Sequence, residues 1–286
     1  CNDCMTGLIP AEAKKLGIPT LFTIHNIHTQ EATLAQLENT GIPAGDFWDE
    51  LYFGSYPESF DESYWTNPID LLASGISAAT HTNVVSPTFL DEVAMGHHPT
   101  IPPHLSHLLY HKREAGVASG IVNAPDRSFN PQIDPYLPEE YGPRRHHTIK
   151  PKLKKDLQKR LLLKEDPSVP ILFWPSRLDP IQKGCSLLAD ILFQLINDYN
   201  HLGLQIVMIA DGPYQQHFQG IVAHHGISDR IAVQPFSESL SHLGYGGSDF
   251  VLMPSSFEPC GLPQMIGCRY GSLPIAHATG GLKDTV

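Results

Sequence analysis

The sequence is poor in cysteine and in long apolar runs, and both shortages exclude classes of protein. Five cysteines in 286 residues do not make the disulfide framework of a small secreted domain, so we expect a reduced, intracellular setting. No apolar run approaches the roughly 20 residues that a membrane-spanning helix needs. Positive charge is also scarce, with 19 Lys and Arg against 30 Asp and Glu. This balance argues against general nucleic-acid binding, which depends on a basic surface.

Two common phosphate-binding fingerprints, G-x-G-x-x-G and G-x-x-x-x-G-K-[ST], are missing, which excludes the usual NAD and P-loop sites. Cys1 and Cys4 resemble half of a zinc site, but no second pair completes it. His104, His107 and His111 share one face of a predicted helix without a nearby cysteine or carboxylate. A solvated or packed helix surface is favoured there. We therefore predict no metal site and no cofactor.

Short apolar runs rich in β-branched residues recur along the chain, and the stretches between them have helical character. Continuous apolar strands that alternate with helices are typical of a parallel sheet covered on both faces. The length favours two such α/β lobes. A Trp/Tyr/Phe-rich stretch at 46–68 predicts a long loop or short helices, and the three tryptophans are expected in the core or at a lobe interface rather than as sugar platforms. The predicted strands are 20–24, 82–85, 120–122, 171–175, 205–209, 231–234, 250–254 and 273–276.

Proline density between 124 and 151 predicts an extended linker. We therefore expect a partial N-terminal lobe at 1–120, a linker at 121–149 and a C-terminal lobe at 150–286. After the linker, Leu153, Leu157 and Leu161 repeat every four residues. This spacing predicts an amphipathic helix with a solvated lysine face, in preference to a site for an anionic partner.

Polar side chains and glycines follow nearly every predicted strand. Ligands of an open parallel sheet bind at the carboxyl ends of its strands, so this joint occurrence predicts an active cleft. The residues concerned are His25-Asn26, Ser86-Pro87, Asn123, Ser176-Arg177, Asp211-Gly212, Glu258 and Thr279-Gly280-Gly281.

Three positions narrow the chemistry of the ligand. Arg177 and Lys183 lie six residues apart after a strand, which suits a departing diphosphate, although an ordinary surface pair is an equal alternative. Glu258 precedes the amides of Cys260, Gly261 and Leu262, which would open a helix able to hold phosphates or sugar hydroxyls. Glu258 itself either caps that helix or acts in a site, where it holds sugar hydroxyls or steadies positive charge on an anomeric carbon. Spacing leaves both hypotheses open.

The stretch PSSFEPCGLPQMIGCRYGSLPIAHATGGLKDTV (254–286) resembles the C-terminal signature of bacterial glycogen synthases and plant starch synthases, glycosyltransferase family 5, which reads P-S-x-F-E-P-C-G-L-x-Q-L. Five further segments resemble motifs of this family in the same order, so the resemblance covers nearly the whole chain. They are FTIHNIHTQ, TNVVSPTFLDEV, GIVNAPD, PSRLDPIQKG and SESLSHLGYGGSDFVLMPS.

The resemblance implies a GT-B fold, in which two Rossmann-like lobes face each other across a cleft. It also implies a metal-independent, retaining transfer of glucose from ADP-glucose to the non-reducing end of an α-1,4-glucan, in the cytoplasm of a bacterium or in a plastid. Arg177 and Lys183 would bind the diphosphate, Glu258 would hold the catalytic acidic position and His25 would lie by the anomeric centre. Phe236 would stack on adenine. The other substrate-binding positions would be Asp3, Asn26, Asn123, Cys260, Gly261, Leu262, Thr279, Gly280 and Gly281.

Several positions depart from the family pattern. Asn2 and Cys4 replace its His and Trp around Asp3, Ala124 replaces a glycine, and Phe236 replaces a tyrosine. These changes keep two other functions open, namely a degenerate homologue that binds glucan or nucleotide without catalysis, and a GT-B transferase with another donor. The sequence resembles a fragment truncated at both ends, without the family's N-terminal K-x-G-G-L-x-D-V loop. We therefore expect the 286-residue chain alone not to elongate glucan.

Overall fold

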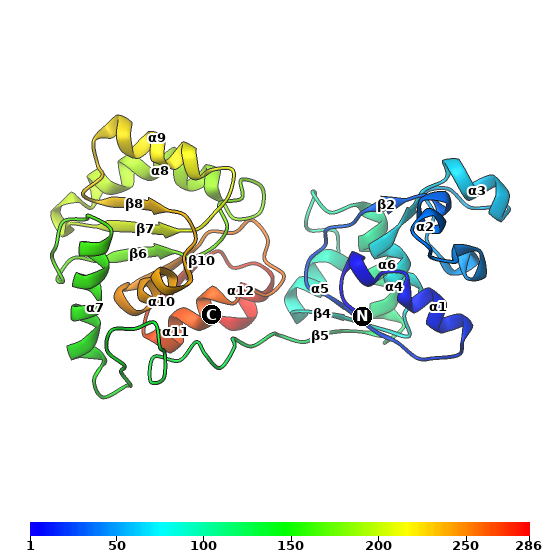
Figure 1. Ribbon diagram of the computed structural model, residues 1–286, viewed down its shortest axis with the longest axis horizontal. Helices are drawn as coiled ribbons and strands as arrows, with labels where there is room; N and C mark the ends of the chain where they lie inside the picture. Colours follow the sequence, from blue (N-terminus) through cyan, green and yellow to red (C-terminus); the bar gives the residue numbers. More distant parts are fainter. The chain divides into compact units, whose positions relative to one another are not determined.

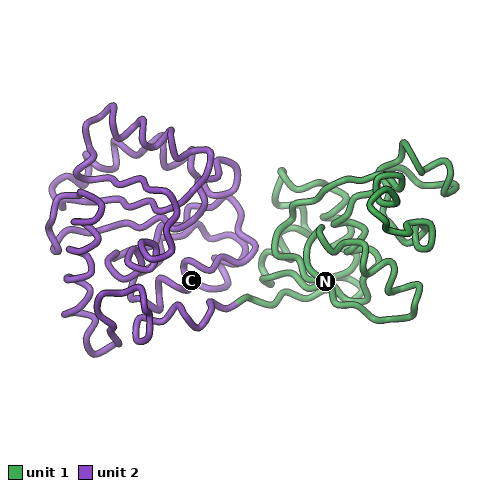
Figure 2. Tube along the Cα trace, in the orientation of Figure 1, with its two compact units in different colours: residues 1–123 green, residues 124–286 purple.

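The computed structural model describes all residues, 1–286, and divides into two compact units (Figure 2). Unit 1 comprises Cys1–Asn123 and unit 2 comprises Ala124–Val286, and each is described by itself. None of the helices combines the length and the apolar character that crossing a lipid bilayer requires.

The core of unit 2 is a five-stranded parallel sheet with the order β10-β9-β6-β7-β8. The first strand in the chain is central, the next two lie on one side of it and the last two on the other, which is the order of the Rossmann fold. The order reverses between β6 and β9, and ligands of such sheets bind at the carboxyl ends of the strands at this point. The strands are β6 (Ile171–Trp174), β7 (Gln205–Ile209), β8 (Ile231–Gln234), β9 (Phe250–Met253) and β10 (Leu273–Ala276).

Helices cover both faces of this sheet (Figure 1). Ile171 and Phe173 of β6 pack in a cluster with α7, α10 and α11, whereas Leu172 and Trp174 pack in a cluster with α8 and α9. Burial on both faces explains why β6 is continuously apolar and why β7 is apolar apart from Gln205. The helices are α7 (His146–Arg160), α8 (Cys185–Asp198), α9 (Gln215–His225), α10 (Glu238–Gly247), α11 (Pro263–Tyr270) and α12 (Gly280–Thr285).

Unit 1 contains a three-stranded parallel sheet with the order β1-β4-β5. Asn2 adds a bridge to Thr23 at the β1 edge. Between β1 and β4 the chain forms several short helices and strands, and the short helices agree with the prediction for the aromatic-rich stretch. The elements are η1 (Cys4–Thr6), α1 (Ile9–Lys15), β1 (Leu21–Ile24), β2 (Glu31–Ala32), α2 (Leu34–Asn39), η2 (Ala44–Asp46), η3 (Trp48–Glu50), α3 (Phe60–Thr66), β3 (Ile69–Asp70), α4 (Leu71–Ala78), β4 (His81–Val84), α5 (Pro87–Ala94), α6 (Pro103–Glu114) and β5 (Ala118–Gly120).

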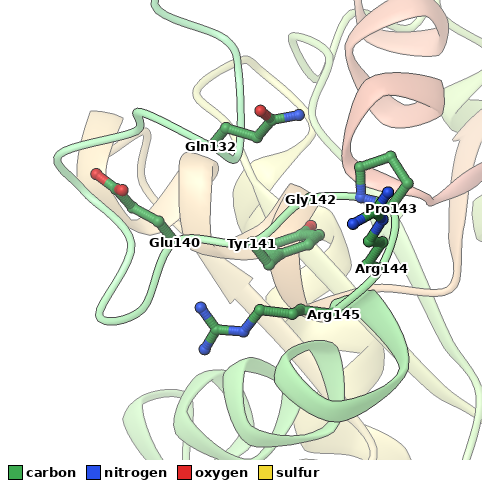
Figure 3. A pocket seen from close by; sticks show the side chains of 7 residues that line it. All are labelled: Gln132, Glu140, Tyr141, Gly142, Pro143, Arg144 and Arg145. Atoms are coloured by element: carbon green, nitrogen blue, oxygen red, sulfur yellow. The ribbon is translucent and has the colours of Figure 1, made fainter.

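All eight predicted strands are present, although the one predicted at 120–122 lies at 118–120. The stretch 121–149 is expected to be an extended linker, but part of it packs into unit 2. Asp134, Leu137 and Tyr141 are buried in unit 2, and the Tyr141 hydroxyl donates to the Tyr270 carbonyl at 2.7 Å. Figure 3 shows Tyr141 in the bend that precedes α7, beside a pocket. Proline spacing reveals an extended backbone, but it does not reveal that the apolar side chains between the prolines pack onto a core.

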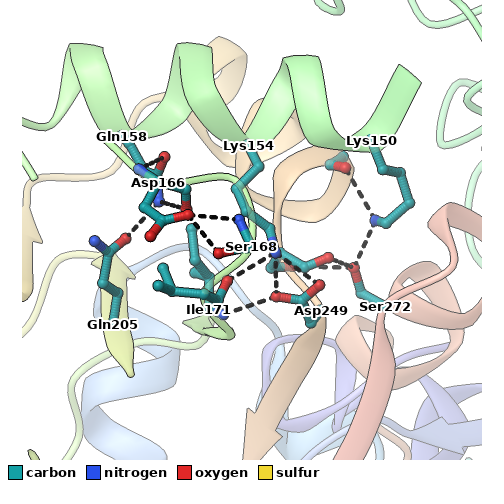
Figure 4. Close-up of polar contacts among 12 residues, drawn as sticks. Lys150, Lys154, Gln158, Asp166, Ser168, Ile171, Gln205, Asp249 and Ser272 are labelled. Atoms are coloured by element: carbon teal, nitrogen blue, oxygen red, sulfur yellow. Dashed lines mark hydrogen bonds and ion pairs between the residues drawn. The ribbon is translucent and has the colours of Figure 1, made fainter. Parts of the chain in front are cut away.

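Helix α7 has the predicted apolar stripe, since Leu153 and Leu157 are buried. The prediction that its lysines face solvent is wrong for Lys150 and Lys154, which turn toward the sheet (Figure 4).

The two inward lysines bind different acceptors. The Lys150 ammonium donates to the carbonyls of Gly246 at 2.9 Å and Tyr270 at 3.0 Å, at the ends of α10 and α11. Burial lowers its pKa to about 8. The Lys154 ammonium binds both carboxylate oxygens of Asp249, at 2.7 and 2.9 Å. Two lysines that the sequence pattern predicts to face solvent therefore bind acceptors inside unit 2.

Candidate functional site

The loops that follow β6 and β9 are tied together at the point where the strand order reverses. The Ser256 amide donates to the Gln182 carbonyl at 2.8 Å, and its hydroxyl donates to the Ile181 carbonyl at 2.8 Å. Gly184, the N-cap residue that precedes α8, has φ +74, and a Cβ there would lie 2.2 Å from the Pro254 carbonyl oxygen. Only glycine permits this close approach. The loops after β6 and β9 are therefore held against each other.

Lys183 and Glu258 form a buried ion pair between these loops. The ammonium lies 2.6 Å from a carboxylate oxygen, and the two side chains are 12% and 7% exposed. The Ser255 hydroxyl donates to the same oxygen at 3.0 Å. Both of these contacts come from outside α11, so they favour the hypothesis that Glu258 acts in a site over the hypothesis that it caps this helix.

The ion pair is chemically suited to receive an anionic group. A lysine ammonium has three donors, and one of them is directed at Glu258. The other two can serve phosphate oxygens while the carboxylate remains bound. Because the pair is buried, its electrostatic effect on a neighbouring ligand is stronger than it would be in water.

Arg177 and Phe236 lie at another part of the carboxyl edge of the unit 2 sheet. They line a pocket of about 390 Å³ together with Pro175, Asp211 and other residues that follow β6, β7 and β8. Phe236 is 57% exposed, so its ring can receive a flat group, and its amide donates to Asp211 Oδ1 at 3.1 Å. The pocket therefore joins a cation to an aromatic platform.

The predicted residues around α11 and α12 adjoin Glu258. The Gly281 amide donates to the Glu258 carbonyl at 2.9 Å, and a Cβ on Gly281 would lie 2.3 Å from the Cys260 carbonyl oxygen. Gly261 has φ +75, and the Gln264 amide group holds its carbonyl at 2.8 Å. Cys260, Thr279 and Gly280 are buried, whereas Leu262 is exposed.

The predicted residues of unit 1 form their own group at the end of β1. The Asp3 carboxylate accepts the amides of His25 at 2.7 Å and Asn26 at 3.2 Å. The His25 ring contacts Asn2 Oδ1 at 3.1 Å through Nε2 and Asn123 Nδ2 at 3.4 Å through Nδ1. Asp3, Asn2 and Asn123 therefore position His25. The sequence did not indicate that both ring nitrogens of His25 have partners.

Sequence reasoning gave no role to Ser255. It placed Asp211 and Gly212 at the predicted cleft without a specific contact, and it noted Asn2 only as a departure from the family pattern. Gly212 lets the loop after β7 approach closely, since a Cβ there would lie 2.5 Å from the Leu178 carbonyl oxygen. Ser255 precedes Glu258 by three residues within the quoted signature, and this proximity was the signal that could have identified it. No group of three or more His, Cys, Asp or Glu side chains is arranged to hold a metal ion.

Comparisons with known proteins agree with this architecture. Residues 1–101 match the model of the starch synthase catalytic domain. The chain is 34% identical over 300 residues to a glycogen synthase of Lachnospira eligens and 34% identical over 306 residues to glycogen synthase 2 of Methylococcus capsulatus. All of the chain and 58% of each relative are covered.

Among solved structures, the catalytic domain of starch synthase IV from Arabidopsis thaliana, bound to ADP and acarbose, matches with a TM-score of 0.81 at 28% identity. All of this chain and 57% of that one are covered. HepE from Anabaena in complex with UDP matches with a TM-score of 0.56 at 15% identity over 99% of this chain and 60% of that one, which supports the fold alone. The chain thus spans little more than half the length of its relatives. With its motifs, its Rossmann-order sheet and these relatives, the chain belongs to the glycogen and starch synthases, glycosyltransferase family 5, with the GT-B fold.

Proposed function

We propose that this protein is a retaining glucosyltransferase that moves glucose from ADP-glucose to the non-reducing end of an α-1,4-glucan, glycogen or starch. The observation that carries the proposal is the buried Lys183–Glu258 pair at the reversal point of the unit 2 sheet. The relatives add support, since those matched over the whole chain are glycogen synthases. A cytoplasmic location in a bacterium, or a plastid location in a plant, is part of the same proposal.

In this proposal the donor nucleotide occupies the carboxyl edge of unit 2. Adenine stacks on Phe236, and the diphosphate receives Arg177 and the two remaining donors of Lys183. The bond between the anomeric carbon and the diphosphate oxygen breaks during transfer, so negative charge grows on the phosphate. Cations placed there stabilise the transition state more than the ground state, which raises the rate.

Glu258 has the complementary role. As the leaving group departs, positive charge develops on the anomeric carbon, and a nearby carboxylate favours that charge. The contacts with Lys183 and the Ser255 hydroxyl hold the Glu258 carboxylate in place. The starts of α11 and α12, next to Glu258, would supply further contacts to the sugar through Cys260, Gly261, Leu262 and Thr279–Gly281.

The test is incorporation of radiolabelled glucose into glycogen from ADP-glucose and from UDP-glucose by the complete gene product. We expect ADP-glucose to be the donor and Glu258→Gln to reduce turnover by orders of magnitude. Glu165→Gln changes an exposed glutamate of the same unit and is the matched control.

Other results of this assay identify the two alternative functions. Transfer from UDP-glucose alone would indicate a GT-B transferase with another donor. Nucleotide binding without transfer from either donor would indicate a degenerate homologue. Near-normal turnover in Glu258→Gln, with the control unchanged, would remove Glu258 from the catalytic machinery.

A further inference from the structure

A hollow of unit 1 is built from aromatic residues that the proposed function leaves unused. The pocket has a volume of about 560 Å³, and one continuous segment, 48–58, lines it. Trp48, Tyr52 and Phe53 contribute to its wall, and Tyr56 is 92% exposed. A tyrosine left so fully in solvent beside other rings offers an apolar face for a ligand.

The segment is held in place before any ligand arrives. Phe53 forms an antiparallel bridge to Ile69. The Ser55 amide donates to the Asn67 side chain at 3.0 Å, and the Asn67 side chain donates back to the Ser55 carbonyl at 2.9 Å. The Trp48 ring packs edge-on against Phe53 with centroids 6.3 Å apart. Binding to such a preformed surface loses little conformational entropy.

The polar groups of the pocket identify the class of ligand. Its lining contains the carboxylates of Asp49 and Glu58, but no lysine or arginine. Lys15 pairs with Asp49 at 2.6 Å and so does not leave a free cation for an anion. Carboxylates repel phosphates and accept hydrogen bonds from hydroxyl groups. Aromatic walls with a few polar acceptors therefore fit a neutral ligand with an apolar face and many hydroxyls.

We propose that this pocket anchors an α-1,4-glucan chain, with the carbon-bound hydrogens of a glucose ring against Tyr56 and its hydroxyls toward Asp49 and Glu58. The inference rests on the proposed function, which makes glucan the acceptor polymer. A sugar ring presents both features, since its faces carry C–H groups and its rim carries hydroxyls. An anchor raises the local concentration of chain ends without taking part in the chemistry.

The test is gel electrophoresis of the 286-residue chain through native gels with and without glycogen, together with calorimetric titration of maltoheptaose. Tyr56→Ala should abolish most of the retardation and weaken maltoheptaose binding at least about fivefold, whereas Tyr56→Phe should retain most of it. Tyr56 is chosen because its exposed side chain contributes little to folding, and urea denaturation checks this.

Trp65 gives a matched control, because it is 69% exposed and lies outside the pocket lining; Trp65→Ala should behave like the wild type. Among the tryptophans expected in the core or at a lobe interface, Trp174 lies in the core with no exposed surface, and an interface position for Trp65 stays a prediction. Unchanged retardation in Tyr56→Ala would overturn the inference. So would equal binding of cellohexaose, or binding of an apolar peptide in place of maltoheptaose.

Two different results separate a wrong assignment of this pocket from a wrong assignment of the function. If the complete protein transfers glucose but Tyr56→Ala binds maltoheptaose normally, the pocket is not an anchor and the proposed function stands. If retardation depends on Tyr56 but no glucose is transferred, the anchor stands and the proposed function fails.

Discussion

Removal of one member of the Lys183–Glu258 pair should destabilise unit 2 as well as stop catalysis. The charged atoms are 2.6 Å apart, which gives an attraction of about 6 kcal/mol at an effective dielectric constant of roughly 20. Loss of solvation offsets part of this attraction. Removing one partner of a buried pair leaves the other charge without compensation and costs about 3–5 kcal/mol. We expect that cost for Lys183→Met and for Glu258→Met.

A double-mutant cycle measures the coupling. The free energy of unfolding is determined by urea denaturation for the wild type, both single variants and the double variant Lys183→Met/Glu258→Met. The double variant contains no uncompensated charge, so its loss of stability should be well below the sum of the two single losses. Additive losses would show that the two charges do not stabilise each other. The exposed pair Lys152–Glu139 at 3.0 Å is the control, and its coupling should be much smaller because solvent screens it.

The ion pair also changes how the substitution of Glu258 by glutamine is interpreted. Glutamine preserves volume, but it leaves the Lys183 ammonium, 12% exposed, without a counter-charge. Some loss of stability is therefore expected alongside the loss of turnover. Activity of Glu258→Gln must be compared at equal amounts of folded protein, and only the remaining deficit reports on catalysis.

Three further predictions concern unit 2. Gly184→Ala should reduce the free energy of unfolding by more than Gly226→Ala, because both have positive φ but only Gly184 faces a carbonyl at 2.2 Å; equal losses would show that the loop yields. For Lys150, the pKa falls from 10.5 in the unfolded chain to about 8 in the folded one, so stability should rise with pH between these values. At pH 9.5 the wild type should gain about 2 kcal/mol over pH 7 relative to Lys150→Met, while the control Lys152→Met keeps the wild-type slope. Burial raises the pKa of Cys185 to about 12, so iodoacetamide at pH 8 should modify exposed Cys268 and spare Cys185 until the protein unfolds, as mass spectrometry would show.

The sheets were predictable because burial on both faces leaves a direct trace in the sequence. Residues 205–209 are buried throughout in β7, and the sequence there is an unbroken strand pattern except for Gln205. That exception has a structural reason, since the buried Gln205 side chain accepts from Gln158 at 2.9 Å. Strand ends were equally clear, and they located Arg177, Glu258 and the residues around them.

The partners of these residues were not predictable, because folding brings them from distant parts of the chain. Lys183 and Glu258 are 75 positions apart, and nothing in their spacing indicates a pair. Leucine periodicity predicted helix α7, but the acceptors that turn Lys150 and Lys154 inward belong to α10, α11 and the start of β9. Motif resemblance can assign a role to a residue, but it does not reveal which distant side chains contact it.

The proposed function requires that a nucleoside diphosphate binds at the carboxyl edge of the unit 2 sheet. Calorimetric titration of ADP into the 286-residue chain tests it most directly, with variants Arg177→Ala and Phe236→Ala and the control Arg144→Ala, an exposed arginine that lines a different pocket of this unit (Figure 3). We expect Phe236→Ala to weaken binding by roughly 1–3 kcal/mol, the value of base–aromatic stacking, and Arg177→Ala to weaken it as well, while Arg144→Ala leaves it unchanged. Equal ADP affinity in all four proteins would show that the nucleotide does not bind at this edge.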